Sequence, residues 1–131
     1  MTGRRFVARR MYEVDDEGRD QLAAALRGRL LLPGEADFDT ARRVWNGTVD
    51  RMPAAIIACQ GVADVIDAVR FAEREGLGVS IRGGGHHVAG GAVLDGGLVI
   101  DLSTMRSVRV DPDAGTVRAE GGALIAETGH L

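Results

Sequence analysis

The sequence predicts an α+β fold, in which an α/β unit with parallel strands is followed by short antiparallel strands. Residues 54–59 form a continuous apolar run that is typical of a strand covered on both faces. Apolar side chains then recur at helical spacing over residues 62–75, and a second short strand is expected at residues 79–82. Because strand–helix–strand units with short connections are parallel as a rule, we expect residues 54–59 and 79–82 to form neighbouring parallel strands.

The first 51 residues are expected to form a lead-in of helices and loops. Residues 15–28 show the apolar spacing of a modestly amphipathic helix. An apolar stretch at residues 30–34 ends in a Pro-Gly turn, and residues 37–45 suit another short helix that begins with an aspartate cap. The sequence therefore predicts two parts, this lead-in and a second unit that comprises residues 52–131.

The later part of the chain contains short strands separated by turns. Three short strands are expected, at residues 98–102, 107–110 and 116–120. The last two are joined by Asp-Pro-Asp-Ala-Gly at residues 111–115, which is a typical turn sequence. This pattern predicts antiparallel pairing in the second half. Asp101, which follows an apolar run, is expected to be a structural hydrogen-bonding carboxylate at a strand end.

Composition limits the classes of partner. The chain has 131 residues with 45% hydrophobic content, which suits one globular domain with a core of its own. Its net charge of -3 argues against nucleic acid as a partner. No apolar segment is long enough for a membrane span or a secretory signal, so we expect no membrane association and a cytoplasmic location. The single cysteine, Cys59, is expected to be a buried and inert thiol.

The most informative segment reads Arg-Gly-Gly-Gly-His-His-Val-Ala-Gly, at residues 82–90 directly after the second predicted strand. Glycines let backbone N–H groups approach a ligand closely, so the segment is a candidate anion-binding nest. The histidines could donate hydrogen bonds, bind a metal or attack an electrophilic carbon. A metal site is not expected, because adjacent side chains rarely converge on one ion and no third ligand has zinc-like spacing. A tight structural connection is the alternative to a binding loop.

Several motifs in order resemble the start of the FAD-binding domain of berberine bridge enzyme-like oxidoreductases. These motifs are Pro-Ala-Ala-Ile-Ile before the helix, Arg-Gly-Gly-Gly-His, Gly-Gly-Leu-Val-Ile-Asp-Leu-Ser and Glu-Gly-Gly-Ala, all between residues 53 and 123. The family belongs to the vanillyl-alcohol oxidase and p-cresol methylhydroxylase superfamily of flavoproteins. The resemblance implies that residues 52–131 are a partial p-cresol methylhydroxylase-type FAD-binding domain.

The resemblance also implies roles for individual residues. The glycine-rich segment corresponds to the family's loop for the FAD pyrophosphate, and His86 stands where many members carry the histidine linked covalently to the 8-methyl carbon of the flavin. Gly122 and Ala123 match a segment that runs beside the cofactor. The candidate cofactor-binding residues are Arg82, Gly83, Gly84, Gly85, His86, His87, Gly90, Gly122 and Ala123.

The resemblance leaves the catalytic machinery unassigned. Family members are several times longer, and most of their catalytic bases and their substrate domain would follow Leu131, so we expect a truncated chain that has no catalytic residue or turnover of its own. Three hypotheses remain for its function. The chain could be the amino-terminal part of a flavin-dependent oxidoreductase that acts on a small-molecule substrate, a non-catalytic FAD- or nucleotide-binding remnant, or an inert gene fragment.

Overall fold

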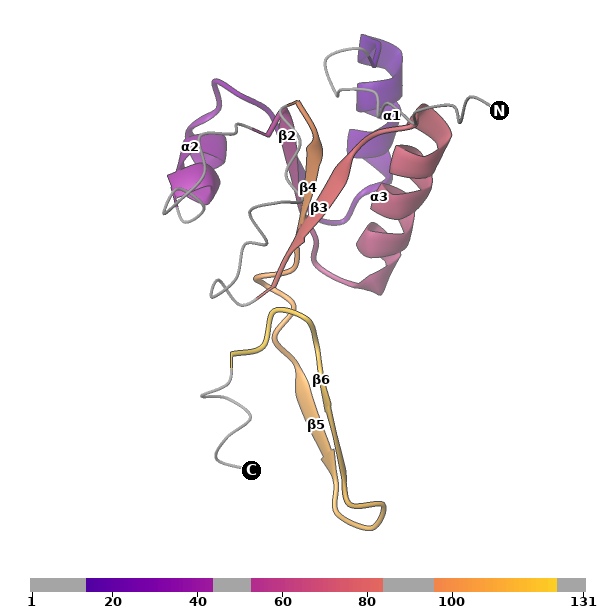
Figure 1. The fold of residues 1–131 in the computed structure, drawn as a ribbon, viewed down its shortest axis with the longest axis vertical. Coiled ribbons are helices and arrows are strands. Elements are labelled where there is room, and N and C mark those ends of the chain that lie inside the picture. The colour runs from indigo at the N-terminus through magenta and orange to yellow at the C-terminus, as the bar shows by residue number, and fades with distance from the viewer. Residues whose placement is uncertain (1–13, 44–52, 84–95, 125–131) are drawn as a thin grey trace, which may run out of the picture.

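The computed structural model describes residues 14–43, 53–83 and 96–124. These ranges contain three helices and six strands (Figure 1). In chain order the elements are α1 (Asp16–Ala25), β1 (Arg29–Leu31), α2 (Ala36–Arg43), β2 (Ala55–Ala58), α3 (Val62–Glu75), β3 (Val79–Arg82), β4 (Leu98–Asp101), β5 (Val108–Asp111) and β6 (Thr116–Ala119).

A four-stranded sheet in the order β1-β2-β4-β3 forms the centre of the fold. Strands β2, β4 and β3 run parallel, whereas β1 is antiparallel to β2. The α+β class and the parallel direction of β2 and β3 were predicted correctly, but their predicted contact is wrong because β4 lies between them. The physical reason is burial: all four residues of β4 are buried, so the central position, covered on both faces, suits this strand.

The prediction of antiparallel pairing in the second half is therefore wrong for β4 and confirmed for β5 and β6. Strand β1, which belongs to the predicted lead-in, contributes to the same sheet as the second predicted unit. The boundary between the two predicted units, at residues 51 and 52, lies outside the described residues.

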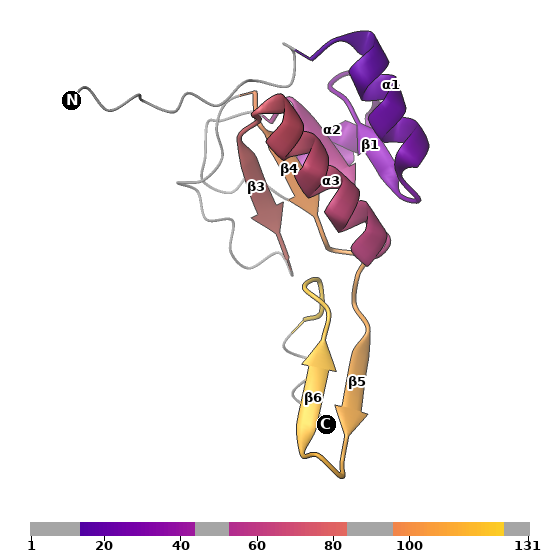
Figure 2. The ribbon, with the colours of Figure 1, turned by 90° about the vertical axis from the view of Figure 1, so that its right-hand side faces the viewer.

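Helices cover both faces of the sheet (Figures 1 and 2). Because neighbouring strand residues point to opposite faces, Ile57 and Ile100 pack in the larger core with Phe71 of α3. Ile56 and Val99 point the other way and pack with Phe38 of α2. The site at the ends of the strands is thus supported by two apolar layers.

The helices begin and end near the positions that the sequence predicts. The Asp15 side chain accepts a hydrogen bond from Gly18 N at 2.8 Å and caps α1. Helix α3 has its predicted bounds and ends at Gly76, whose φ of 65° favours glycine. The predicted helix over residues 37–45 is observed as Ala36–Arg43, and the residues that follow it are outside the described ranges.

A buried carboxylate ties the first part of the chain to α3. Asp64, in the first turn of α3, is 1% exposed and accepts hydrogen bonds from three backbone N–H groups. The donors are Arg27 N at 2.7 Å, Gly28 N at 2.8 Å and Gln60 N at 2.9 Å. Burial acts to raise the pKa of Asp64, but these hydrogen bonds outweigh it and the pKa lies below its usual value.

Strands β5 and β6 form a hairpin that extends away from the rest of the structure (Figure 2). Its turn is fixed by Asp111, whose carboxylate accepts hydrogen bonds from Asp113 N and Ala114 N, and by Gly115 at φ 64°. Across the described ranges, no helix has the length and apolar character needed to cross a membrane.

Candidate cofactor-binding site

The carboxyl ends of β2, β4 and β3 meet at one edge of the sheet. Register pairs Arg82, the last residue of β3, with Asp101, the last residue of β4. Open α/β sheets bind ligands at this edge, and the glycine-rich segment begins here with Gly83. Of the predicted site residues, the structure describes Arg82, Gly83, Gly122 and Ala123; Gly84, Gly85, His86, His87 and Gly90 lie outside the described residues.

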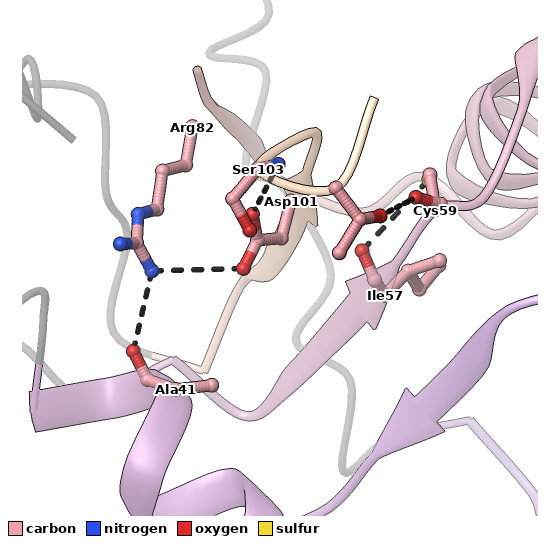
Figure 3. A network of polar contacts seen from close by, with 7 residues as sticks. Ala41, Ile57, Cys59, Arg82, Asp101 and Ser103 are labelled. Carbon is pink, nitrogen blue, oxygen red and sulfur yellow. Dashed lines mark hydrogen bonds and ion pairs between the residues drawn. The ribbon is translucent and has the colours of Figure 1, made fainter. Parts of the chain in front are cut away.

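Arg82 is directed into the protein (Figure 3). Only 6% of the residue is exposed, and its Nη1 lies 3.6 Å from Asp101 Oδ2 and 3.4 Å from the Ala41 carbonyl oxygen, to which it donates a hydrogen bond. The other carboxylate oxygen of Asp101 accepts a hydrogen bond from Ser103 N at 2.8 Å. The structural role predicted for Asp101 is therefore confirmed, whereas no sequence pattern indicated Arg82 as its partner.

Backbone hydrogen bonds join the three strand ends. Leu102 N donates to the Arg82 carbonyl at 2.9 Å, and Cys59 N donates to the Asp101 carbonyl at 3.0 Å. Thr104, which the sequence reasoning missed, donates its hydroxyl to the Cys59 carbonyl at 2.7 Å. These main-chain groups are thus satisfied within the protein, and the strand ends form a fixed base for the segment that starts at Gly83.

Two glycine-rich stretches that are distant in sequence meet at this base. A Cβ added to Gly83 would lie 2.6 Å from the Gly121 carbonyl oxygen. A Cβ on Gly122 would lie 1.9 Å from the Leu102 carbonyl oxygen, and Gly122 N donates to the Met105 carbonyl at 2.9 Å. Only glycine fits at Gly83 and Gly122, and close packing of the main chain explains both residues.

The single cysteine, Cys59, is buried directly after β2. Burial, followed by the charges of Asp64 and Asp101, raises the pKa of Cys59 to about 11, so its thiol is protonated and inert at neutral pH, as predicted. The ranges that the structure describes hold no cluster of three or more histidine, cysteine or acidic side chains suited to a metal ion.

The described residues fit a phosphate-bearing cofactor. Gly83 follows β3 at the carboxyl edge of the parallel strands, and open α/β sheets bind phosphates through main-chain N–H groups at this edge. The neighbouring carboxylates are engaged: Asp101 pairs with Arg82, and Glu120 accepts a hydrogen bond from Ser107 N at 2.8 Å. The negative charge of Asp101 is therefore compensated by Arg82, and the Glu120 side chain is held by a backbone N–H group.

This combination of fold and site defines an α+β domain of the kind that binds a nucleotide cofactor at a sheet edge. The sequence model of a family described as "FAD binding domain" matches residues 53–130. The match covers more than half of the chain, so the chain belongs to this family of FAD-linked oxidoreductase domains. The family and the FAD cofactor predicted from the resemblance are thereby confirmed.

Individual relatives agree with this assignment. The chain is 35% identical over 100 residues to (R)-6-hydroxynicotine oxidase of Paenarthrobacter nicotinovorans, covering 76% of this chain and 22% of that protein. It is 32% identical over 87 residues to berberine bridge enzyme-like 14 of Arabidopsis thaliana, covering 65% of this chain and 16% of that protein. The chain thus spans about a fifth of the length of these curated relatives.

Solved structures show the same fold. The crystal structure of 6-hydroxy-D-nicotine oxidase from Arthrobacter nicotinovorans superposes with a TM-score of 0.67 at 35% identity, over 76% of this chain and 22% of that one. Physcomitrella patens BBE-like 1 superposes with a TM-score of 0.63 at 32% identity, over 75% and 22% of the two chains. By name the first is an oxidase and the second a BBE-like protein, and their fold agrees with the predicted fold class.

Proposed function

We propose that this chain supplies the pyrophosphate-binding part of an FAD-dependent oxidoreductase. The main-chain N–H groups of the segment from Gly83 to Gly90 hold the pyrophosphate, and Gly122 and Ala123 lie beside the cofactor. Bound FAD supplies an acceptor for a hydride from a small-molecule substrate. The observation that carries the proposal is the fixed base at the ends of β2, β3 and β4, which presents the glycine-rich segment at the edge where parallel sheets bind phosphates.

Titration of the protein with FAD tests this proposal by nuclear magnetic resonance. Saturable shifts of the amide signals of Gly83, Gly84 and Gly85 are expected, because a pyrophosphate accepts hydrogen bonds from N–H groups of this segment. Two fragments of the cofactor provide matched probes. ADP, which retains the two phosphates, should reproduce these shifts, whereas riboflavin, which lacks them, should not. Absence of any saturable shift with FAD and ADP would refute the proposal.

We further propose that His86, and not His87, links the flavin covalently. A neutral imidazole is a nucleophile, and the new bond joins a ring nitrogen to the 8-methyl carbon of the flavin. One proton from that methyl group and the ring N–H proton leave, while two electrons pass to the flavin and from it to dioxygen. The position of His86 in the Arg-Gly-Gly-Gly-His motif supports this assignment.

Fragment mass spectrometry of protein that carries flavin locates the adduct. The His86→Ala variant should lose covalent flavin and the His87→Ala variant should retain it. The reverse result would place the link one residue further along, and covalent flavin in both variants would exclude a histidine link in this motif.

A non-catalytic domain that binds FAD is the second candidate. It predicts the same amide shifts without reduction of bound flavin. Anaerobic bleaching of the flavin absorbance by a small-molecule substrate separates the two, because only an oxidoreductase transfers a hydride to the flavin.

A further inference from the structure

Arg82 and Asp101 form a buried pair at the ends of β3 and β4, next to Gly83, with which the proposed phosphate-binding segment begins. Their side chains are 7% and 8% exposed, they lie opposite each other in the parallel register, and Nη1 and Oδ2 are 3.6 Å apart. Arg82 is also the residue that precedes Gly83. Any movement of this side chain would therefore move the first residue of the segment.

We propose that Arg82 is a positioning residue for FAD, which holds the start of the glycine-rich segment through Asp101 and does not contact the phosphates with its guanidinium. This inference rests on the proposed function. Gly83 has no side chain that could fix its own backbone, so its position depends on what holds the strand end. The Gly121 carbonyl oxygen lies too close to Gly83 to leave room for a Cβ, so the Gly83 backbone has little freedom to shift.

The charges favour this indirect role over a direct phosphate contact. If the guanidinium turned toward a phosphate, the Oδ2 atom of Asp101 would lose its cation while buried, which is unfavourable. A buried Asp101 carboxylate near a phosphate would also repel it. With the pair intact, both charges are compensated, and the Ala41 carbonyl accepts a further hydrogen bond from the same guanidinium.

Two buried polar atoms favour the alternative role, in which Arg82 contacts the phosphates directly. Arg82 Nε and Ser80 Oγ are buried and have no hydrogen-bond partner among the described residues. Both residues are buried two positions apart on β3, so they share a face of the strand. A phosphate oxygen could accept a hydrogen bond from Nε. The two roles for Arg82 therefore need an experiment in which they predict opposite results.

Replacement of Asp101 provides that experiment. Asp101→Asn keeps the side-chain shape and an oxygen that can accept from Ser103 N, but it removes the charge that holds Arg82. If Arg82 positions the segment, FAD and ADP should each bind about tenfold more weakly, as is typical when a supporting partner of a binding group is removed. If Arg82 contacts the phosphates directly, Asp101→Asn should bind as tightly as the wild type or more tightly, which would overturn the inference.

A double-mutant cycle shows whether the two residues act as one unit. Arg82→Met should weaken ADP binding as much as Asp101→Asn does. The double variant should bind ADP no more weakly than the single variant that has the lower affinity. Additive losses would mean that Arg82 and Asp101 act separately and would refute the inference. The amide signals of Gly83 and Gly121 in ligand-free protein provide a second readout, since both should shift in Asp101→Asn before any ligand is added.

A matched control separates positioning from a general loss of stability. Asp64→Asn also removes a buried carboxylate, but Asp64 bonds only to backbone N–H groups away from β3 and β4. Measured well below the unfolding temperature of each variant, ADP affinity should be unchanged in Asp64→Asn and reduced in Asp101→Asn. Equal losses in both would refute the inference. Failure of the wild type to bind either ligand would refute the proposed function together with it.

Discussion

The structure predicts that Asp64 is a large single contributor to stability, through its hydrogen bonds to two separate segments that precede it in sequence. Its Oδ1 accepts from Arg27 N, and its Oδ2 accepts from Gly28 N and Gln60 N. The carboxylate thereby joins the connection between α1 and β1 to the start of α3. It also places a negative charge in the first turn of α3, where the helix dipole favours one.

Two substitutions of Asp64 should lower the free energy of unfolding by different amounts. An asparagine at position 64 can keep its oxygen toward Gly28 N and Gln60 N, but its NH₂ group then faces Arg27 N, so one charge-assisted bond is lost at a cost of about 2–3 kcal/mol. Alanine loses all three acceptor contacts and should cost about 4 kcal/mol, since part of the penalty is recovered by water. For a chain of this size each kcal/mol lowers the melting temperature by about 4 °C.

Urea unfolding followed by circular dichroism measures these differences, and the slope of unfolding free energy against urea concentration should be the same in all variants. Asp16→Asn is the matched control, because this carboxylate is also in a first helical turn but its side chain is 89% exposed, and the change should cost less than about 0.5 kcal/mol. An Asp64→Asn variant as stable as that control, or an Asp64→Ala variant no worse than Asp64→Asn, would refute the reasoning.

The pH dependence provides an independent check on the same residue. The folded-state pKa of Asp64 lies below its unfolded-state value, because three hydrogen bonds to the carboxylate outweigh the effect of burial. The stabilisation is therefore complete above the unfolded value of about 3.9 and is lost as pH falls through the lower folded value. The gap in unfolding free energy between wild type and Asp64→Asn should shrink below about pH 4. A gap that is constant down to pH 2 would contradict the assignment.

Two further predictions concern the strand-end region. Gly122→Ala should destabilise the protein by several kcal/mol, because its Cβ would lie 1.9 Å from the Leu102 carbonyl oxygen, whereas Gly61→Ala, with open space around it, should be near neutral in the same urea assay. Equal stability of the two variants would contradict the close packing at Gly122. At pH 8 the Cys59 thiol, with a pKa of about 11, should react with a disulfide reagent at least about a hundredfold more slowly in folded than in guanidinium-unfolded protein. Similar rates would show that the thiol is accessible in the folded state.

The elements were predictable where local patterns decide them. The helix from Val62 to Glu75 shows helical apolar spacing and a glycine directly after it, and its observed bounds agree with the prediction. The hairpin of β5 and β6 carries its turn residues between its strands, so its antiparallel pairing was also readable. Both structures depend on residues that are close in sequence, which is why a single sequence contains enough information.

Strand order depends on contacts between distant segments, so the sequence pattern did not determine the neighbours of β4. The short apolar run of β4 has the pattern of a buried strand, but periodicity does not say which strands it lies between. Its position was assigned from its neighbours in sequence, which are antiparallel. The structure instead inserts β4 between β2 and β3, where its full burial is satisfied on both faces.

The same error concealed the partner of Arg82. Both Arg82 and Asp101 end an apolar run and both are polar, so each was recognisable as the last residue of a strand. Parallel strands that pair directly bring their final residues together at one edge, and a cation and a carboxylate meeting there form an ion pair. With β2 assigned as the neighbour of β3, Arg82 had no such partner and was assigned to the cofactor alone. Once β4 is placed beside β3, the pair follows from register, and this buried pair is the observation behind the proposed role of Arg82 in holding the start of the glycine-rich segment.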